Sequence, residues 1–404
     1  MHVAAVLKAS MKLHSSFAVA AVSVVALLAC PRKLLAQSIP DIVWQTNAHG
    51  GKVWSVAFSG DGGTLASGSE DLTAKVWTVP GGGLVRTVTT PHAKVIAVAL
   101  HTPGDNLLTG GDDGAVREWA IGSGNLLWGG SPNDDIIWSV AISPNGSTTA
   151  GGRSCGLIGI VGSDGSDGYH FEGHGGDVYS VTFSPDGSKL ASASKDGTAK
   201  IWLVMDGTIL QTLTGHSFLS TNEDDIVINA VADVDFSPDG TLLLTTGADS
   251  TARLWRVSDG IQVAVLEGGG GNAAKFSSDG KTLFTVTNGR INFWRVADGR
   301  LLAAYDAGAG PLAVAPSGKY FAYGRGDGAV VLARVPLWIE SITQAQGRVA
   351  LSWHGGSGRY QVQARRHSDK GHWHNLGVPT TKTTLTRSCS SRQLFYRVLS
   401  LPNP

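Results

Sequence analysis

Residues 178–202 read VYSVTFSPDGSKLASASKDGTAKIW, and this stretch decides the fold. Val178–Phe183 alternates apolar and polar side chains, which indicates a strand with one buried face. A tight turn, Ser184-Pro-Asp-Gly187, separates it from a strand of small residues, Leu190–Ala193. A second turn and a third strand ending in Trp202 follow. The stretch therefore predicts three antiparallel strands joined by short turns.

The turn recurs along the chain. Its copies begin at Ser59, Thr102, Ser143, Ser184, Ser237, Ser277 and Ala315, with spacings of 43, 41, 41, 53, 40 and 38 residues. A fourth strand, such as 84–89 or 210–213, leads from each unit to the next. Repeats of about 40 residues with four strands each are typical of propeller blades. We therefore predict seven blades, with an insertion, 217–229, in the long interval.

At these residues the chain resembles the WD-repeat β-propeller family, over about residues 41–335. In that family a His, a Ser or Thr, an Asp and a Trp form a hydrogen-bonded tetrad within a blade. The resemblance implies such tetrads at His49, Ser67, Asp71 and Trp77 in blade 1, His92, Thr109, Asp113 and Trp119 in blade 2, and His174, Ser192, Asp196 and Trp202 in blade 4.

The other blades depart from the family pattern. Blade 5 has Thr245, Asp249 and Trp255, with His216 displaced by the insertion. Blade 3 has Ile160 and blade 7 has Ala333 where Trp is expected. Blade 6 keeps Trp294 but has Asn288 in place of the Asp. These changes weaken the tetrads of three blades without changing the predicted fold.

The ends of the repeat predict how the ring closes. Blade 7 has only three strands before Val335, whereas Ile42–Thr46 is a strand without a blade of its own. We expect this N-terminal strand to complete blade 7, because closure leaves no long exposed sheet edge.

Composition agrees with an all-β protein. Glycine accounts for 54 of 404 residues, and glycine in helix interiors is destabilising. An apolar content of 42% with 12 Trp argues against disorder. Zero net charge conceals an asymmetry: residues 1–36 carry +4, residues 37–335 carry −11 and residues 336–404 carry +7. This split predicts three parts with different surfaces.

Residues 1–36 are predicted to be a signal peptide. Lys8 and Lys12 precede the apolar run Phe17–Cys30, which is short for a membrane span. We therefore expect a secreted or periplasmic protein with no transmembrane span in its mature form. Lipid attachment through Cys30 is one alternative, and an N-terminal strand or helix packed on the protein is another.

Residues 336–404 are predicted to form a small basic β-sandwich-like domain. Four alternating segments, Val349–Trp353, Tyr360–Gln363, Lys382–Arg387 and Leu394–Val398, resemble a fibronectin type III-like domain. Trp353 and Tyr360 are expected on adjacent strands. The 69 residues are fewer than such a domain usually has.

No residues predict catalysis, a cofactor or a metal. The Gly152–Gly156 match to the hydrolase pattern G-x-S-x-G falls in a β-hairpin rather than a strand-to-helix turn. Two groups of residues are of types that bind metal ions, but neither provides a full set of ligands. One is the tail histidines His367, His372 and His374, and the other is the acidic loops 134–135 and 223–225. We therefore predict that the protein is not an enzyme.

The clearest functional signal is positional. Four large residues share one position, the second residue of a predicted innermost strand: Trp54, Ile96, Trp138 and Tyr179. The resemblance to the WD-repeat family implies that this position lies near the channel mouth, on the face where the family binds partners. Large aromatic residues dominate binding hot spots. The competing explanation is packing between blades. An acidic loop, Glu223, Asp224 and Asp225, is predicted to lie on the same face.

Together these patterns predict an exported, non-catalytic scaffold that binds an unknown protein partner through the top face of the propeller. The alternative is a glycan- or cell-envelope-binding protein that uses the aromatics and the basic tail. Nucleic acid is an unsuitable partner, because an acidic propeller repels phosphate.

Overall fold

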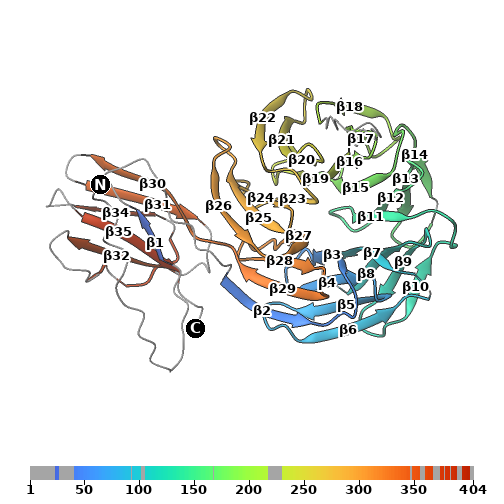
Figure 1. Ribbon diagram of the computed structural model, residues 1–404, viewed down its shortest axis with the longest axis horizontal. Coiled ribbons are helices and arrows are strands. Elements are labelled where there is room, and N and C mark those ends of the chain that lie inside the picture. Colours follow the sequence, from blue (N-terminus) through green and yellow to red (C-terminus); the bar gives the residue numbers. More distant parts are fainter. Residues whose placement is uncertain are drawn as a thin grey trace, which may run out of the picture. The chain divides into compact units, whose positions relative to one another are not determined.

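The computed structural model describes residues 23–26, 41–91, 93–101, 105–166, 168–216, 230–345, 348–354, 360–366, 374–376, 378–382, 384–388 and 394–400. The chain divides into two compact units. The larger unit, within residues 31–336, consists of seven four-stranded antiparallel sheets arranged as a ring (Figure 1). The described residues contain no helix, so the predicted all-β, seven-bladed propeller is confirmed.

Each sheet is one blade, and the chain passes through it from the centre of the ring outward. The innermost strands are β3 (Val53–Phe58), β7 (Val95–Leu100), β11 (Ile137–Ile142), β15 (Val178–Phe183), β19 (Val231–Phe236), β23 (Ala273–Phe276) and β27 (Ala309–Val314). The second strands are β4 (Thr64–Ser69), β8 (Asn106–Gly111), β12 (Thr148–Arg153), β16 (Lys189–Ser194), β20 (Leu242–Gly247), β24 (Thr282–Thr287) and β28 (Tyr320–Arg325).

The outer half of each blade is built in the same way. The third strands are β5 (Thr73–Thr78), β9 (Val116–Ala120), β13 (Ile158–Gly162), β17 (Ala199–Leu203), β21 (Thr251–Arg256), β25 (Arg290–Arg295) and β29 (Ala329–Arg334). The outermost strands are β6 (Leu84–Thr89), β10 (Leu126–Gly129), β14 (Tyr169–Phe171), β18 (Ile209–Leu213), β22 (Gln262–Glu267), β26 (Leu301–Asp306) and β2 (Asp41–Asn47).

The repeated turn is held by its own side chains. In blade 4 the Ser184 hydroxyl donates to Asp186 at 2.6 Å, and the Asp186 carboxylate accepts the Ser188 N–H at 3.0 Å. Gly187 has φ +72°, a conformation that suits glycine. The same Ser-to-Asp bond occurs in blades 1, 5 and 6. Local side-chain chemistry therefore fixes each hairpin between the first and second strands.

The ring closes through β2. This strand pairs antiparallel with β29, from Asp41 opposite Arg334 to Asn47 opposite Ala329. The Arg334 guanidinium lies 3.1 Å from the Asp41 carboxylate. Innermost strand β27 contacts β3, so the first and last blades are neighbours. The outer strand of blade 7 is therefore the first strand of the propeller in sequence.

The tetrad of blade 4 is a continuous hydrogen-bond chain. The Trp202 indole donates to Ser192 at 2.7 Å, and Ser192 lies 2.7 Å from Nε2 of His174. His174 Nδ1 lies 2.8 Å from Asp196. Because the Ser192 oxygen accepts from Trp202, its own hydrogen donates to His174, and Nδ1–H donates to the carboxylate. Burial alone would raise the pKa of Asp196, but the bonds from His174, Thr198 and Gly175 outweigh burial and hold that pKa well below its usual range.

Blade 1 has the same chain through His49, Ser67, Asp71 and Trp77. In blade 5 the insertion separates His216 only in the sequence. Its Nδ1 lies 3.0 Å from Asp249 and its Nε2 lies 2.7 Å from Thr245, which also accepts the Trp255 indole N–H at 2.8 Å.

Blade 2 is built differently in part. The Trp119 indole donates to Thr109 at 2.9 Å, and Asp113 accepts both arms of Arg117, the closer at 2.5 Å. His92 lies outside the described residues.

The strand register corrects one sequence assignment. In blade 4 Trp202 pairs with Leu190, six residues after the turn serine. The equivalent pair in blade 3 is Val161 with Thr149, and Ile160 pairs with Ala150. Val161, not Ile160, therefore occupies the tryptophan position of blade 3. The prediction was wrong by one residue because it aligned a blade without a landmark Trp.

The smaller unit contains two sheets. One has the order β1-β35-β32-β33 and the other β30-β31-β34. Their strands are β1 (Ser23–Ala26), β30 (Trp338–Ala345), β31 (Arg348–His354), β32 (Tyr360–Arg366), β33 (His374–Asn375), β34 (Thr384–Ser388) and β35 (Leu394–Ser400). Buried residues from both sheets share a core: Leu337, Leu351, Trp353, Tyr360, Val362 and Val398.

Three features of this unit differ from the sequence expectations. Trp353 and Tyr360 lie on consecutive strands of different sheets, with ring centroids 5.7 Å apart at 75°. Strand β30 was not predicted. Strand β1 lies inside the segment expected to be an export signal, and it pairs with β35. The likeness to a fibronectin type III domain stays a prediction.

Candidate functional site

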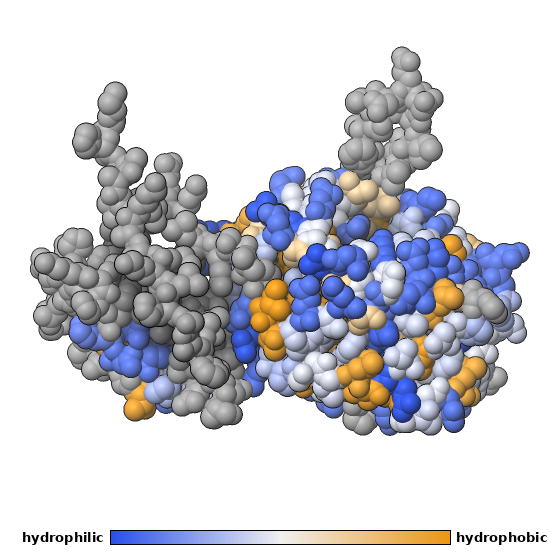
Figure 2. All heavy atoms as spheres, turned by 60° about the horizontal axis from the view of Figure 1, so that its bottom comes forward, coloured by the Kyte–Doolittle hydropathy of each residue, from blue (hydrophilic) through white to orange (hydrophobic). Residues whose placement is uncertain are grey.

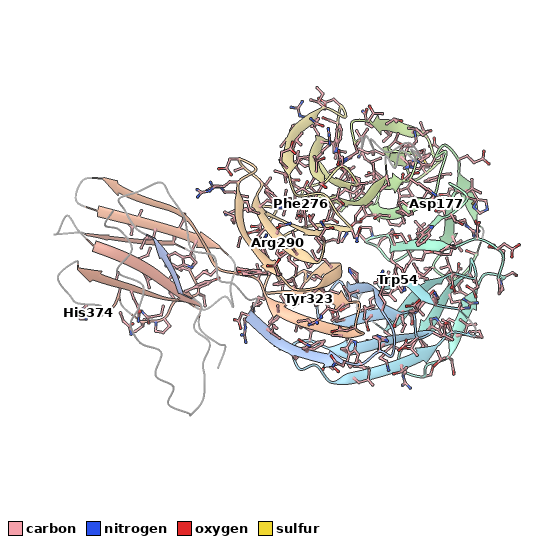
Figure 3. All side chains as sticks on the ribbon, viewed as in Figure 1. Trp54, Asp177, Phe276, Arg290, Tyr323 and His374 are labelled. Carbon is pink, nitrogen blue, oxygen red and sulfur yellow. The ribbon has the colours of Figure 1, made fainter. Side chains whose placement is uncertain are left out.

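The structure brings the four predicted interface residues together around one end of the central channel. Trp54, Ile96, Trp138 and Tyr179, the second residues of β3, β7, β11 and β15, line a cavity of about 430 Å³. The remaining blades contribute small residues to the same wall, namely Ala230, Ala232, Asn272, Gly310 and Pro311. Figure 3 marks Trp54 at the inner rim of the ring. The side chains on one half of the mouth are therefore large and mainly aromatic, and those on the other half are small.

The aromatic side chains have unused polar groups. Trp138 and Tyr179 meet edge to face, with centroids 5.6 Å apart at 82°. The Lys52 ammonium lies 3.5 Å from the centroid of Trp54. The indole N–H groups of Trp54 and Trp138 have no hydrogen-bond partner, although both rings are half-buried. Both nitrogens are themselves buried, so a partner at the mouth would contact the carbon atoms of these rings.

The acidic loop predicted beside this mouth, Glu223, Asp224 and Asp225, lies outside the described residues. So do two of the three tail histidines, His367 and His372. Within the described part of the chain, no group of three or more His, Cys, Asp or Glu side chains is arranged to hold a metal ion.

A charged cluster lines the channel beyond the mouth. The channel cavity measures about 290 Å³ and shares the residues of the aromatic rim. Asp233 accepts the Ser180 hydroxyl at 2.6 Å, the Ala274 N–H at 2.8 Å and the Lys275 ammonium at 3.0 Å. Asp235, two residues on, accepts the Phe276 N–H at 2.7 Å. These bonds join the inner strands of blades 4, 5 and 6.

The cluster has unusual proton affinities. Burial raises the pKa of Asp235 to about 6 against the opposing charge of Lys275. Burial alone would lower the pKa of Lys275, but the negative charges of Asp233 and Asp235 outweigh it and raise that pKa. Sequence reasoning missed these residues, although two aspartates inside the apolar strand Val231–Phe236 are a visible signal.

Replacing Asp235 with Asn is expected to stabilise the protein more at pH 8 than at pH 5. The folded-state pKa of Asp235 lies above its ordinary value, so the wild type loses stability as the pH rises through about 6. Asn stays neutral and can still accept the Phe276 N–H. We expect the variant's gain in unfolding free energy to be on the order of 1 kcal/mol greater at pH 8, measured by thermal and urea melts.

The matched control is Asp186→Asn in an exposed turn. Hydrogen bonds from Ser184 and Ser188 lower the pKa of Asp186 to about 2, so both folded and unfolded carboxyls are largely ionised from pH 5 to pH 8. Its effect should be the same at both pH values. An Asp235→Asn effect that is equally constant would show that Asp235 is not the titrating group.

The comparisons with known proteins agree with the geometry. The family described as WD domain, G-beta repeat, matches residues 41–78, 82–120, 165–202 and 207–256. The chain contains WD40 repeats. The four matches end with the third strands of blades 1, 2, 4 and 5, the blades in which a Trp donates to a Ser or Thr and an Asp follows the second strand. Blade 6 is not matched, and blades 3 and 7 are matched only in their outer strands, β14 and β2.

Curated relatives resemble parts of this WD40 propeller. Translation initiation factor 3 subunit I of Aspergillus terreus is 36% identical over 122 residues, which are 30% of this chain and 33% of the relative. Nuclear distribution protein PAC1 of Arthroderma benhamiae is 44% identical over 94 residues, 21% of this chain and 18% of the relative. The chain thus spans a third or less of the length of these relatives.

These relatives overturn the predicted localisation. A translation initiation factor subunit and a nuclear distribution protein are intracellular fungal proteins, which argues against a secreted or periplasmic WD40 protein and against lipid attachment through Cys30. The glycan- or envelope-binding alternative stays a prediction. Among the described residues, no helix has the length and apolar character to cross a membrane.

Proposed function

We propose that this WD40 propeller is a non-catalytic scaffold that binds a protein partner at the channel mouth. The observation that carries the proposal is the one-sided rim of Trp54, Ile96, Trp138 and Tyr179 around a cavity of about 430 Å³. Aromatic anchors in partly buried pockets supply most of the energy of many interfaces. The resemblance to subunit I of translation initiation factor 3, a component of a larger factor by its name, supports a role in assembly.

The partial exposure of the rim favours binding over packing alone. The edge-to-face contact of Trp138 with Tyr179 does pack blade 3 against blade 4. However, the side chains of Trp54, Trp138 and Tyr179 are only half-buried, and all three line the cavity. The rim therefore has apolar area available to a partner.

The test is the triple variant Trp54→Ala, Trp138→Ala and Tyr179→Ala, compared with the wild type by crosslinking in cells and mass spectrometry. We expect the specific partner to be lost while the propeller remains folded, as judged by its melting curve. Each hot-spot truncation costs about 2 kcal/mol or more, so the affinity should fall by at least about a thousandfold.

The matched control is a triple variant on or directly before the outer strands, Leu84→Ala, Leu126→Ala and Ile261→Ala. These side chains are about half exposed, at 53%, 49% and 53%. Exposed apolar residues of this kind occur as separate patches among hydrophilic ones (Figure 2). The control should keep the partner. If the folded rim variant keeps it as well, the channel mouth is not the binding face.

A further inference from the structure

Blade 3 lacks every side chain of the tetrad. By register, Gly151 stands where Ser192 stands in blade 4, and Val161 stands where Trp202 stands. By the same spacing from the turn, Cys155 replaces Asp196 and Asn133 replaces His174. In blade 4 this Trp side chain, which donates to the Ser, helps to fill the interface with blade 3. Val and Gly at the same positions of blade 3 leave much of the equivalent volume, at its interface with blade 2, unfilled.

The facing blade is reduced as well. Gly130 pairs with Val116 at the position where the outer strands of other blades carry a large apolar residue. The equivalent residues are Val88, Phe171, Leu213, Leu266 and Tyr305. Gly159 likewise replaces a long basic side chain, which in other blades is Lys75, Arg117, Lys200 or Arg253.

These glycines are not required by the backbone. Gly130, Gly151 and Gly159 have no positive φ, and a Cβ on any of them would make only ordinary contacts, the closest at 3.4 Å from Val116. Larger side chains would fit, and their absence leaves a hollow between blades 2 and 3. The cavity has a volume of about 330 Å³, within the range of small-ligand sites.

The cavity is lined by one aromatic side chain, one cation and one carboxylate, Asp164, which accepts the Ser166 N–H at 2.9 Å. The Trp128 indole N–H is held by the Ser163 carbonyl at 2.9 Å and by Glu118, and Gly165 lies directly against the ring. Arg153 lines the cavity too. Only a 3.4 Å contact joins it to Asp135, and its buried Nε has no hydrogen-bond partner. An orphaned buried guanidinium donor is costly and calls for an acceptor.

We propose that this cavity binds a small planar aromatic carboxylate. The ring occupies the space that an indole fills in blades 1, 2, 4 and 5 and packs against Trp128. The carboxylate accepts hydrogen bonds from Arg153, whose planar fork suits that group. The site lies between two blades and is separate from the channel mouth, so it adds a ligand site to the scaffold.

The first test titrates three probes into the full chain by calorimetry: indole-3-acetate, indole and tryptamine. The expected order of affinity is indole-3-acetate, then indole, then tryptamine. All three probes contain the indole ring, but only indole-3-acetate supplies an anion to Arg153, and tryptamine carries a cation that Arg153 repels. We expect a stoichiometry of one and a preference of about tenfold for the carboxylate over indole. No binding of any probe, or tighter binding of tryptamine, would overturn the proposal.

Val161→Trp supplies the missing indole within the chain. We expect it to raise the melting temperature by filling the cavity and to weaken indole-3-acetate binding by at least about tenfold. A folded variant with wild-type affinity would place the ligand elsewhere.

Arg153→Gln keeps the test decisive if Val161→Trp does not fold. It should weaken indole-3-acetate about tenfold and leave indole unchanged. The matched control, Arg256→Gln, removes the same charge from an exposed pair with Asp259 and should change neither affinity. Equal effects of the two arginine variants would mean that the anion is attracted by net charge rather than by this site.

Discussion

Deleting Asp41–Asn47 is expected to lower the melting temperature of the propeller by about 10 °C or more. The deletion removes β2, the outer strand of blade 7, which pairs with residues Ala329–Arg334 of β29. It also removes Trp44, whose ring lies 6.1 Å from that of Trp77, and the ion pair of Asp41 with Arg334. Several ladder hydrogen bonds and one half-buried Trp amount to about 5 kcal/mol, a large share of typical domain stability.

A peptide with the sequence of residues 41–48 provides the control. Added in excess to the deletion variant, it should raise the melting temperature toward that of the full chain, because it can pair with the free edge of β29. A scrambled peptide should not. A melting temperature unchanged by the deletion would show that β2 contributes nothing to closing the ring.

Trp202→Ala is expected to destabilise the protein by about 3–5 kcal/mol. Trp202 is fully buried, stacks on Phe171 at 5.6 Å and 22°, and donates to Ser192. Its loss leaves a cavity between blades 3 and 4 and removes the donor that orders Ser192 and His174. Urea unfolding of the full chain measures the effect as a lower midpoint.

The matched control is Val161→Ala, at the same strand position in blade 3. Val161 borders the existing cavity and has no tetrad to support, so its loss should cost about 1 kcal/mol or less. Similar losses in the two variants would show that the tetrad position has no special role in stability.

Much of the propeller could be predicted because its turns are local. Ser184 and Asp186 bond to each other two residues apart, so the sequence motif and the structure are nearly the same observation. Closure could also be expected, because a strand without a blade and a blade without a strand must satisfy their edges together.

Other features depend on register between distant strands. The pairing of Val161 with Thr149 cannot be read without a landmark Trp, which is why Ile160 was assigned in error. His216 returns to Thr245 across an insertion that sequence spacing cannot bridge. The cavity beside Trp128 is invisible in the sequence, because it results from small residues on two blades that become neighbours only in the ring.

The closing strand also has a consequence for synthesis. Asp41 and Arg334 are 293 residues apart, so β2 leaves the ribosome long before its partner β29 exists. At ordinary translation rates the interval is about 15–60 s. During this time β2 has no native partner, and its pairing with β29 is a contact of large sequence separation, a kind that slows folding. The pairing that closes the finished ring can therefore form only after almost the whole propeller has been synthesised.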